Sequence, residues 1–474
     1  MISSRHIIII FFWFIATEAH TQKVWSLEDC ITYAYQNNIQ IKQQELNTDI
    51  KKYDLLQSKA ALLPNLNASA SHTYNFGRTI DMYTNDFATS RVQSNNFYIS
   101  TGVTLFNGFQ LLNTVKQQMI EKQVSEYELE KLKNDISLSI ATAYLQVLFN
   151  YEIRDIRLNQ YEISEQQLQR TILLVDAGTL SKSNQLAIEA QLAADNLQYV
   201  NAQNQLALSY LTLTQMLDLP STDDFEIERP LIDITLLNFP SQTPEYIFNT
   251  SLILQPEIKT AELKLKSAYK SLSIARSTIS PNLSLRASYG TGYSGASKEI
   301  TDVVLFDYIP IGYTQSQEIV YGPSFNYITQ VKPFKEQLDD NLNQSVGFTM
   351  TIPIFNGLQS RTSINKAKIL IKNAEYNLQN TKNQLNKSIQ QAYADAKSAY
   401  NRYLASLKSV EAYEESFKYT EQKFNLGMLN SLEYNDAKIK LSNAKSELLQ
   451  SKYEYLFRLK ILDFYQGKPI SIKS

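Results

Sequence analysis

The sequence of 474 residues is poor in the side chains on which most enzyme chemistry depends. It has one cysteine, Cys30, so it can form neither an intramolecular disulfide nor a cysteine-based metal site. Its three histidines, His6, His20 and His72, are too few for a zinc site, and a Ser-His-Asp triad would depend on His20 or His72 alone. The formal net charge of -2 provides no electrostatic footprint for nucleic acid. We therefore expect no enzyme, metal site, cofactor or nucleic-acid partner.

Glycine and proline are also scarce, with 13 and 12 residues, and their placement indicates long helices. Proline is missing from 65–219 and 354–468, and glycine from 109–177 and 358–426. The stretches that lack both residues are too rich in Leu, Ile and Tyr to be disordered. We predict long helices over 109–175 and 358–424, each roughly 100 Å long at a rise of 1.5 Å per residue. Such a helix is about three times as long as a bilayer core is thick, so it must project into water.

Residues 1–19 have the pattern of a secretory signal peptide. Arg5 and His6 precede an apolar run over 7–16, and small residues follow near Ala19. An N-terminal membrane anchor is the alternative. Beyond this segment no apolar run reaches the roughly 18 residues of a transmembrane helix, so a membrane role would depend on β-strands.

The chain contains an internal duplication. At an offset of 249 residues, Phe106-Asn107-Gly108 recurs as Phe355-Asn356-Gly357, Ala143-Tyr144 as Ala392-Tyr393, and Gly178-Thr179-Leu180 as Gly427-Met428-Leu429. Pro64-Asn65-Leu66 recurs as Pro281-Asn282-Leu283 at an offset of 217, so the second copy carries 32 extra residues between these landmarks. We predict two repeats, 20–219 and 243–466. A linker, 220–242, with strand-like pieces near 232–237 joins them, and a tail, 467–474, follows.

Each repeat is predicted to contain a helix, two strands, a long helix and a returning helix. In the first repeat these are a helix over 28–62, strands 66–76 and 97–106, the long helix 109–175 and a helix 183–217. In the second they are a helix over 248–279, strands 283–293 and 345–355, the long helix 358–424 and a helix 431–463. An apolar stripe with helical spacing runs along the first long helix through Leu129, Leu132, Ile136, Ile140, Ala143 and Val147. The fold class is therefore mainly α with a small β part.

The four strands alternate between apolar residues and small polar residues. Leu283, Leu285 and Ala287 oppose Ser284 and Arg286, for example, and the other strands follow the same rule. Strands of this kind suit a tilted membrane barrel with lipid outside and water inside. A soluble sandwich with one buried face is the alternative. Because four strands close neither a sandwich nor a barrel, a membrane wall would need several chains.

Together, the signal peptide, the duplicated order of elements, the Pro-Asn-Leu and Phe-Asn-Gly landmarks and the Gly-x-Leu turns resemble the TolC-type outer-membrane efflux protein family over about 25–466. The resemblance implies a homotrimer with a 12-stranded outer-membrane β-barrel, to which each chain gives four strands, and a periplasmic α-barrel. A belt formed by 220–242 and the tail is implied too. Members are passive exit ducts that work with a periplasmic adaptor and an inner-membrane transporter in drug efflux or type I secretion.

In this family, acidic rings after the second glycine turn narrow the tunnel. The matching residues are Glu433 and Asp436, whose spacing of three places both on one helix face. The alternative is that Glu433 only favours its own helix terminus. Asn184 stands where the family pattern has an acidic residue, and Leu429 where it has an arginine. We therefore expect the constriction at Glu433, Asp436 and Asn184 to close by polar or apolar packing rather than by a charged latch.

The helix turns also meet the adaptor in this family. By position, the contacts are Gly178, Leu180 and Ser181 in one turn and Gly427, Leu429 and Asn430 in the other. A leucine beside a glycine turn can instead be a simple helix C-cap contact. Ser181 or Ser183, and Asn430, are the predicted N-caps of the returning helices.

The 32 extra residues lie within 295–340, a segment rich in tyrosine that is expected to face the cell exterior. We expect a variable loop, with partial cover of the pore as the alternative. The predicted function is a passive outer-membrane conduit. Its rivals are a trimeric coiled-coil stalk or adhesin without channel activity and, more distantly, an enzyme.

Overall fold

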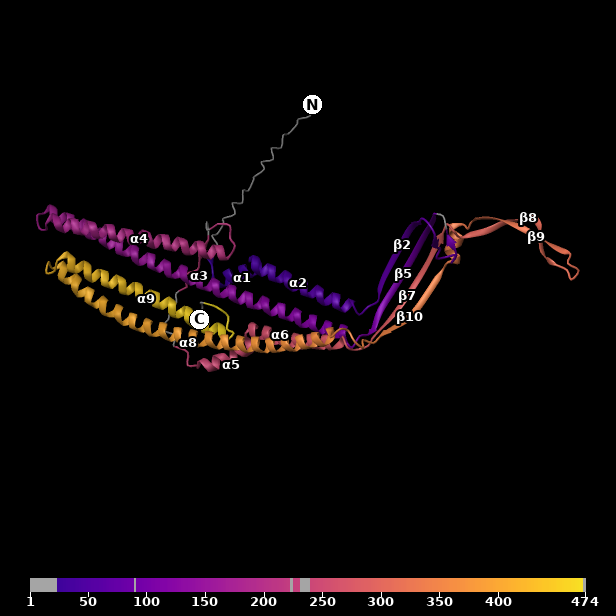
Figure 1. Ribbon diagram of the computed structural model, residues 1–474. Coiled ribbons are helices and arrows are strands. Elements are labelled where there is room, and N and C mark those ends of the chain that lie inside the picture. Colours follow the sequence, from indigo (N-terminus) through magenta and orange to yellow (C-terminus); the bar gives the residue numbers. More distant parts are fainter. Residues whose placement is uncertain (1–23, 89–90, 222–224, 231–238, 472–474) are drawn as a thin grey trace, which may run out of the picture. The chain divides into compact units, whose positions relative to one another are not determined.

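The computed structural model describes residues 24–88, 91–221, 225–230 and 239–471 (Figure 1). The predicted signal peptide, 1–19, and the strand-like pieces expected near 232–237 lie outside these residues. The remaining predicted elements can be compared with the structure directly.

The chain divides into two compact units, and neither unit is one of the sequence repeats. The helical unit contains the chain up to Ile50, Gln123–Leu263 and the chain from Glu375 onward. The sheet unit contains Lys51–Lys122 and Lys264–Ala374. Each unit takes elements from both repeats, so the repeats describe the sequence and the units describe the packing.

The helices of the two repeats match in length. The short helices α1 (Leu27–Asn37) and α5 (Pro244–Leu254) have 11 residues each, and α2 (Ile39–Ala60) and α6 (Pro256–Ser277) have 22 each. The long helices α3 (Gln110–Asp176) and α8 (Gln359–Asn425) have 67 residues each. The returning helices α4 (Lys182–Met216) and α9 (Ser431–Tyr465) have 35 each. The two long helices and the two returning helices begin and end within about two residues of the positions expected from the sequence. The duplication is thus a duplication of structure.

The helix expected over 28–62 is in fact two helices, α1 and α2. They are separated by Asn38, whose backbone is extended, with φ -60° and ψ 128°. The Oδ1 atom of Asn38 accepts hydrogen bonds from the backbone N–H groups of Gln40 (3.0 Å) and Ile41 (3.3 Å). The prediction of one helix was wrong because an asparagine that caps the next helix ends the first one without changing its apolar pattern.

The helix expected over 248–279 is likewise divided, into α5 and α6. Gln255 separates them with ψ 127°, and Pro256 follows it directly. A proline keeps the preceding residue out of the helical conformation, so the break was readable from the sequence. The Nε2 atom of Gln255 donates to the carbonyl oxygen of Phe464 (3.2 Å), which ties this break to the end of α9.

The core of the helical unit contains the predicted stripe of α3. Ile140, Ala143 and Val147 are buried, and the residues of the stripe nearer the start of α3 are half-buried. The thiol of Cys30 in α1 is fully buried in the same core. Within the described ranges, no helix is both long enough and apolar enough to cross a membrane.

The described part of the linker packs against α3. Its strand β6 (Glu226–Ile227) pairs in parallel with β1 (Val24–Trp25). The hydroxyl of Tyr144 donates to the carbonyl oxygen of Glu228 (2.7 Å), which holds this small sheet on the helix. The chain after α9 returns to the same unit, where the Ser471 hydroxyl donates to Glu28 (2.6 Å).

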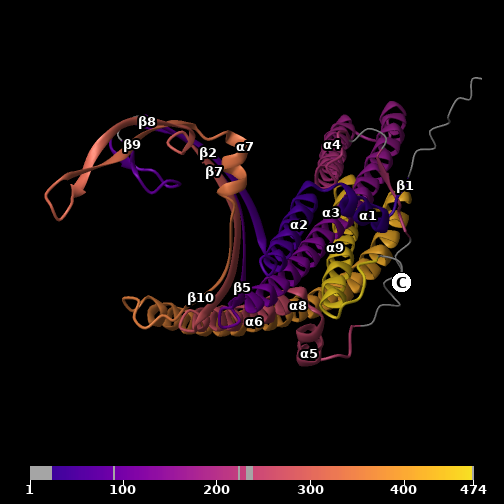
Figure 2. The ribbon, with the colours of Figure 1, turned by 90° about the vertical axis from the view of Figure 1, so that its right-hand side faces the viewer.

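The sheet unit contains a curved, four-stranded antiparallel sheet (Figure 2). Its order is β10 (Asn343–Thr351), β7 (Asn282–Ser294), β5 (Val92–Phe106) and β2 (Asn65–Asn75). The repeats meet where β5 pairs with β7. β5 begins five residues before the strand predicted at 97–106. β10 ends short of 355, because Pro353 has no N–H for the ladder.

The strand register brings the predicted faces of the sheet together. One cross-strand row contains Leu66, Thr101, Ala287 and Val346, and a row on the opposite face contains Asn67, Ser100, Ser288 and Ser345. The hydroxyls of Ser288 and Ser345 are 2.8 Å apart. Every residue of the edge strands β2 and β10 is exposed. The sheet therefore has an apolar face and a polar face, and the described chain covers neither along these edges.

The segment 295–340 is not the loop that we expected. It forms a long hairpin of β8 (Lys298–Tyr313) and β9 (Ile319–Val331), followed by a short helix, α7 (Phe334–Asp340). A second, short hairpin of β3 (Thr79–Ile80) and β4 (Phe87–Ala88) lies in the corresponding connection of the first repeat. The extra residues of the second repeat therefore build regular structure.

Candidate functional site

The two long helices end in the same kind of turn, and these two turns with the residues around them form the candidate site. Gly178 follows α3 with φ 75°, and Gly427 follows α8 with φ 74°. After α3, the Thr179 N–H donates to the Leu174 carbonyl (2.8 Å) and the Gly178 N–H to the Val175 carbonyl (2.9 Å). After α8, the Met428 N–H donates to the Lys423 carbonyl (2.9 Å) and the Gly427 N–H to the Phe424 carbonyl (3.0 Å). This is the Schellman pattern, which satisfies the last carbonyls of the helix and reverses the chain. We call the two turns the tip turns.

The returning helices begin with different caps. The Oδ1 atom of Asn430 accepts a hydrogen bond from the Glu433 backbone N–H (2.9 Å), as predicted. Ser181 occupies the N-cap position of α4 with extended backbone but makes no side-chain cap bond. Ser183, the other candidate, lies inside α4 and is not the cap. The α9 start is therefore the better fixed of the two.

The predicted carboxylates lie on the exposed surface of α9. Glu433 is exposed within the first turn of the helix. Asp436 is exposed as well and forms an ion pair with Lys440 (2.6 Å) one turn further on. Asn184 is half-buried in the first turn of α4, and its side chain has no hydrogen bond to either carboxylate in the part of the chain that is described. One chain thus displays two carboxylates but does not gather the three residues.

The predicted adaptor contacts divide into exposed and half-buried residues. Gly178, Ser181, Gly427 and Asn430 are exposed, whereas Leu180 and Leu429 are half-buried. The leucines therefore have the partial local cover expected of a helix C-cap contact.

The most exposed apolar side chains at the second tip turn are ones that we did not predict. Leu426 is 75% exposed and Met428 70% exposed. The first tip turn has Ala177 and Thr179 at the matching positions. The second tip turn therefore has a pair of exposed apolar side chains that the first tip turn lacks. A position-by-position comparison of the two repeats in the sequence would have revealed this difference.

A buried polar cluster joins the two helical hairpins of the helical unit. Its centre is Lys438 of α9, which is only 4% exposed. The Nζ atom of Lys438 donates to the Ser164 hydroxyl of α3 (2.8 Å) and to the carbonyl oxygen of Gln160 (3.3 Å). The Ser164 hydroxyl in turn donates to Asp195 of α4, which lies 4.0 Å from the ammonium group. We call Lys438, Ser164 and Asp195 the hairpin clamp.

Burial controls the electrostatics of the hairpin clamp. Desolvation lowers the pKa of Lys438 to about 8, and the nearby Asp195 carboxylate opposes this shift. Desolvation also lowers the pKa of Arg157, one of its neighbours on α3, with Asp195 again opposing. The Asp195 carboxylate accepts a further hydrogen bond from Gln191 (2.9 Å). Each charged group therefore has two hydrogen-bond partners, and the lowered pKa of Lys438 results from its loss of water.

Two further contacts connect α3 to α9 along the same face. Arg157 donates to the Ser442 hydroxyl (3.2 Å), and the Tyr453 hydroxyl donates to Glu152. Beyond the clamp, toward the second tip turn, Tyr434 is buried against Phe424, with ring centroids 4.5 Å apart. The second hairpin is therefore held to the first by polar contacts in the helical unit, while its tip is held by aromatic packing.

These arrangements have counterparts among known proteins. A sequence model described as "Outer membrane efflux protein" matches residues 30–218 and 248–467. Outer membrane protein TolC of Escherichia coli (strain K12) is 23% identical over 438 residues, which cover 89% of this chain and 78% of that protein. The match to the family takes in both repeats, so the chain is one of the duplicated outer-membrane efflux channels.

Solved structures with low sequence identity share the fold. The Campylobacter jejuni CmeC outer membrane channel superposes with a TM-score of 0.74 at 17% identity, covering 94% of this chain and 87% of that one. The outer membrane protein VceC of Vibrio cholerae gives 0.73 at 15% identity, covering 94% and 96%. The chain belongs to the outer membrane efflux protein family, whose members are channels and not enzymes.

Proposed function

We propose that three copies of this protein form an exit channel in the outer membrane. The observation that carries the proposal is the four-stranded sheet with edge strands β2 and β10, whose residues are all exposed. An open sheet edge cannot lie in lipid, because each unpaired backbone group there costs several kcal/mol. Since β2 and β10 run in opposite directions, β2 of one copy can pair with β10 of the next. Three copies then close an antiparallel barrel of 12 strands.

The two faces of the sheet suit this environment. The rows that contain Leu66 and Val346 would face lipid, and the rows that contain Asn67 and Ser345 would face a water-filled lumen. Arg286 lies on the polar face, where it pairs in register with Gly102 and Gly347 and would be hydrated. The helices of the helical unit would extend into the periplasm as an α-barrel, in keeping with their length.

The function of each tip turn follows from this placement. We infer that Glu433, Asp436 and Asn184, which one chain does not bring together, form a constriction when threefold symmetry repeats them around one axis. Polar and apolar packing would hold this constriction closed, because residue 429 is a leucine and cannot form the ion pair that an arginine at this position would make with the carboxylates. The residues proposed to contact a periplasmic adaptor are Gly178, Leu180, Ser181, Gly427, Leu429 and Asn430. The exposed Leu426 and Met428 extend that surface.

The proposed energy source is external to this chain. An inner-membrane transporter would move the cargo into the duct through the adaptor, and this protein would supply only a sealed path across the outer membrane.

Cysteine cross-linking of the sheet edges tests the barrel. In a Cys30→Ala background, Asn67→Cys on β2 is combined in turn with Ser345→Cys, Gly347→Cys or Thr349→Cys on β10, which samples alternate registers on the polar face. Oxidation in outer-membrane vesicles should yield a covalent trimer in one register, because each copy then bonds to both neighbours. Monomers alone in all three combinations would contradict the proposal. The matched control pairs Asn67→Cys with Val346→Cys on the opposite face, which should not cross-link.

A further inference from the structure

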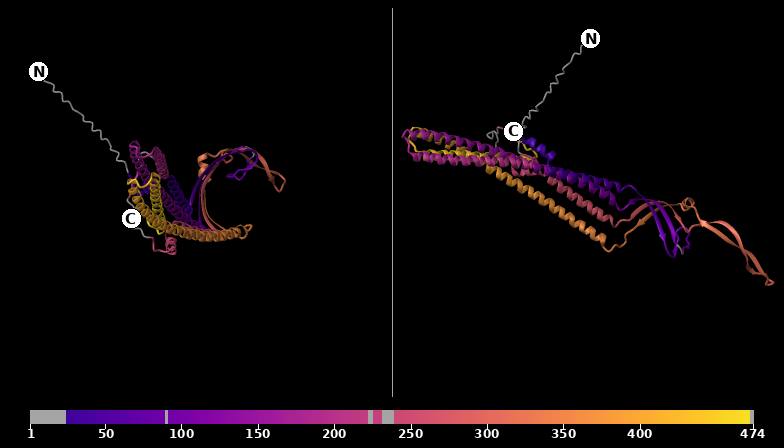
Figure 3. Two further views of the ribbon diagram at one scale, coloured as in Figure 1. Left: turned by 90° about the vertical axis from the view of Figure 1, so that its left-hand side faces the viewer. Right: turned by 90° about the horizontal axis from the view of Figure 1, so that it is seen from above.

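Within the residues described, the β8–β9 hairpin extends from the end of the four-stranded sheet with no other element of the sheet unit along it (Figure 3). It carries a continuous apolar face. The register puts five cross-strand pairs on one face: Val303 with Tyr327, Leu305 with Phe325, Tyr308 with Pro323, Pro310 with Tyr321, and Tyr313 with Ile319. All ten residues are apolar or aromatic, and all are exposed. We call this surface the aromatic face.

The opposite face has a different character. Its pairs are Asp302 with Ile328, Val304 with Asn326, Asp307 with Ser324, Ile309 with Gly322, and Gly312 with Val320. Each pair includes at least one small or polar residue and none includes an aromatic ring, although aliphatic residues are present and Ile311, at a bulge, also lies on this face over Gly322. The paired aromatic residues are thus confined to one side of the ribbon, which is therefore the side with the larger apolar surface to cover.

Three β-bulges keep the aromatic face continuous. Register shifts occur between Ile300 and Asp302, between Leu305 and Asp307, and between Pro310 and Gly312. Each shift gives β8 one extra residue, so that aromatic and aliphatic side chains return to the same face beyond it.

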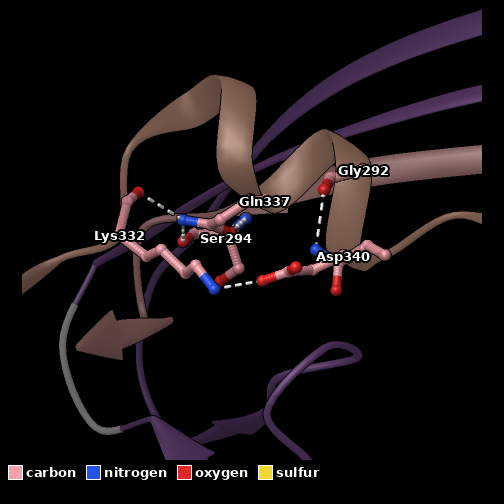
Figure 4. A network of polar contacts seen from close by, with 6 residues as sticks. Gly292, Ser294, Lys332, Gln337 and Asp340 are labelled. Atoms are coloured by element: carbon pink, nitrogen blue, oxygen red, sulfur yellow. Dashed lines mark hydrogen bonds and ion pairs between the residues drawn. The ribbon is translucent and has the colours of Figure 1, made fainter.

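The hairpin is fixed at its base, as Figure 4 shows. Gln337 of α7 is buried, and its side chain accepts from the Ser294 backbone N–H (2.9 Å) and donates to the carbonyl oxygens of Ser294 (3.0 Å) and Lys332 (2.8 Å). The side chain of Lys332 forms an ion pair with Asp340. The backbone N–H of Lys332 donates to the Ser297 carbonyl (3.0 Å) and closes the neck. These bonds hold both ends of the hairpin to the end of the sheet.

We propose that the aromatic faces of the β8–β9 hairpins pack against one another between copies of this chain, outside the barrel. The inference rests on the trimer proposed above. The hairpin leaves the sheet from β7 and returns to β10, the edge strand that would pair with the next copy. The three hairpins therefore stand at the same height around one axis. A two-stranded ribbon is only marginally stable in water by itself, and packing the faces together stabilises it while removing a large apolar surface from water.

Two features favour this occupant over others. Residues 298–331 contain four acidic residues, Glu299, Asp302, Asp307 and Glu318, and one basic residue, Lys298, so anionic lipid headgroups would repel the ribbon. Pro310 and Pro323 lack the N–H that an added strand would need, so pairing along the hairpin edges is disfavoured. The remaining contact is between faces.

Two single-cysteine variants in a Cys30→Ala background test the contact. Tyr321→Cys lies on the aromatic face, and the matched control Asn326→Cys lies on the same strand on the opposite face. When outer-membrane vesicles are treated with a short bismaleimide, Tyr321→Cys should give a cross-linked dimer as its main product. Asn326→Cys should remain monomeric under the same treatment. Equal yields from both variants, or a Tyr321→Cys adduct only with another polypeptide, would overturn the proposal.

A deletion gives a second measurement. Replacement of 298–331 by Asn-Gly between Ser297 and Lys332 leaves the network at the base in place. The trimer should then dissociate in detergent at a lower temperature than the wild type, because the packed aromatic faces are gone. An unchanged dissociation temperature would overturn the inference.

The sheet-edge cross-links separate the two proposals. If the β2–β10 cysteine pair gives a covalent trimer but Tyr321→Cys gives no dimer, only the proposed packing of the hairpins is contradicted. A chain that remains monomeric removes the proposed channel and the hairpin inference together.

Discussion

At the scale of single residues, capping and burial explain features that hydrophobic pattern alone does not reveal. Asn38 and Asn430 each cap a helix through a side-chain oxygen, and Asn38 thereby divides what the sequence pattern presents as one helix. Gly178 and Gly427 have positive φ, which an L-residue with a side chain adopts only with strain. These polar and glycine positions set the ends of the helices, while the apolar stripe sets their faces.

The unequal caps at the two tip turns lead to a prediction. Asn430→Ala should destabilise the first turn of α9 by about 1 kcal/mol, because the Glu433 N–H loses its acceptor. Ser181→Ala should have little effect on α4, because the Ser181 side chain makes no cap bond. Amide hydrogen exchange measures both: protection in the first turn of α9 should fall about fivefold in the first variant. An equal loss of protection in the two variants would contradict the assignment of the caps.

Lys438 shows why part of the site could not be predicted. Its sequence context, within an amphipathic helix rich in lysine, is that of a solvated residue, and only the packing of α9 against α3 and α4 buries it. The tip residues were predictable because glycine turns and caps are local. A charge that is buried by two helices distant in the sequence depends on tertiary packing, which a single sequence does not display.

At the scale of elements, the duplication explains how much of the fold was predictable. Both long helices and the four strands of the sheet follow from glycine and proline placement and from alternation. The β8–β9 hairpin was missed because its three bulges interrupt the alternation along β8. The β8 residues on the aromatic face are spaced alternately by two and by three positions, so they do not show the regular period of a strand. The alternation in β9 is regular from Ile319 to Tyr327, so that strand was within reach.

The hairpin clamp links three helices, so its removal is expected to lower the free energy of unfolding of the helical unit. Lys438→Met should destabilise the helical unit by about 3 kcal/mol, because it leaves the buried Asp195 without its cation. The double variant Lys438→Met with Asp195→Leu should recover most of that loss, since apolar packing replaces the pair. Thermal unfolding of the detergent-solubilised protein measures both. A double variant no more stable than the single one would show that the lysine acts alone.

The clamp also predicts a dependence on pH. The folded-state pKa of Lys438, about 8, lies below its ordinary value of 10.5, so the unfolded chain binds more protons between these values. Stability should therefore rise with pH across this window in the wild type relative to Lys438→Met, and the difference should be constant below about pH 8. Paired thermal unfolding curves from pH 7 to pH 10.5 provide the measurement. A difference that falls as pH rises would reverse the sign and contradict the burial of a charged lysine.

At the scale of the whole molecule, the structure of one chain is incomplete by itself. The edge strands β2 and β10 are exposed along their length, the carboxylates Glu433 and Asp436 face solvent, and the aromatic face of the β8–β9 hairpin is uncovered by other described residues. Each of these features is explained if copies of the chain repeat around a threefold axis. The proposed channel therefore depends on assembly of several copies rather than on chemistry within one chain.

The constriction gives a prediction for the assembly. Replacing Glu433 and Asp436 together by Ala should raise single-channel conductance and weaken block by divalent cations, because up to six carboxylates around one axis are removed. Glu447→Ala is the matched control, since it removes an exposed carboxylate from the same helix away from the tip turn. Identical currents and identical cation block in the variant and the wild type would remove these two residues from the constriction.

We propose that this chain forms a water-filled pore only as a trimer. The most direct measurement is single-channel recording of the purified protein in planar lipid bilayers, with its mass in detergent determined by light scattering on the same sample. We expect discrete conductance steps from a species with three times the mass of one chain. A protein that stays monomeric and never raises the conductance of the bilayer would contradict the proposal.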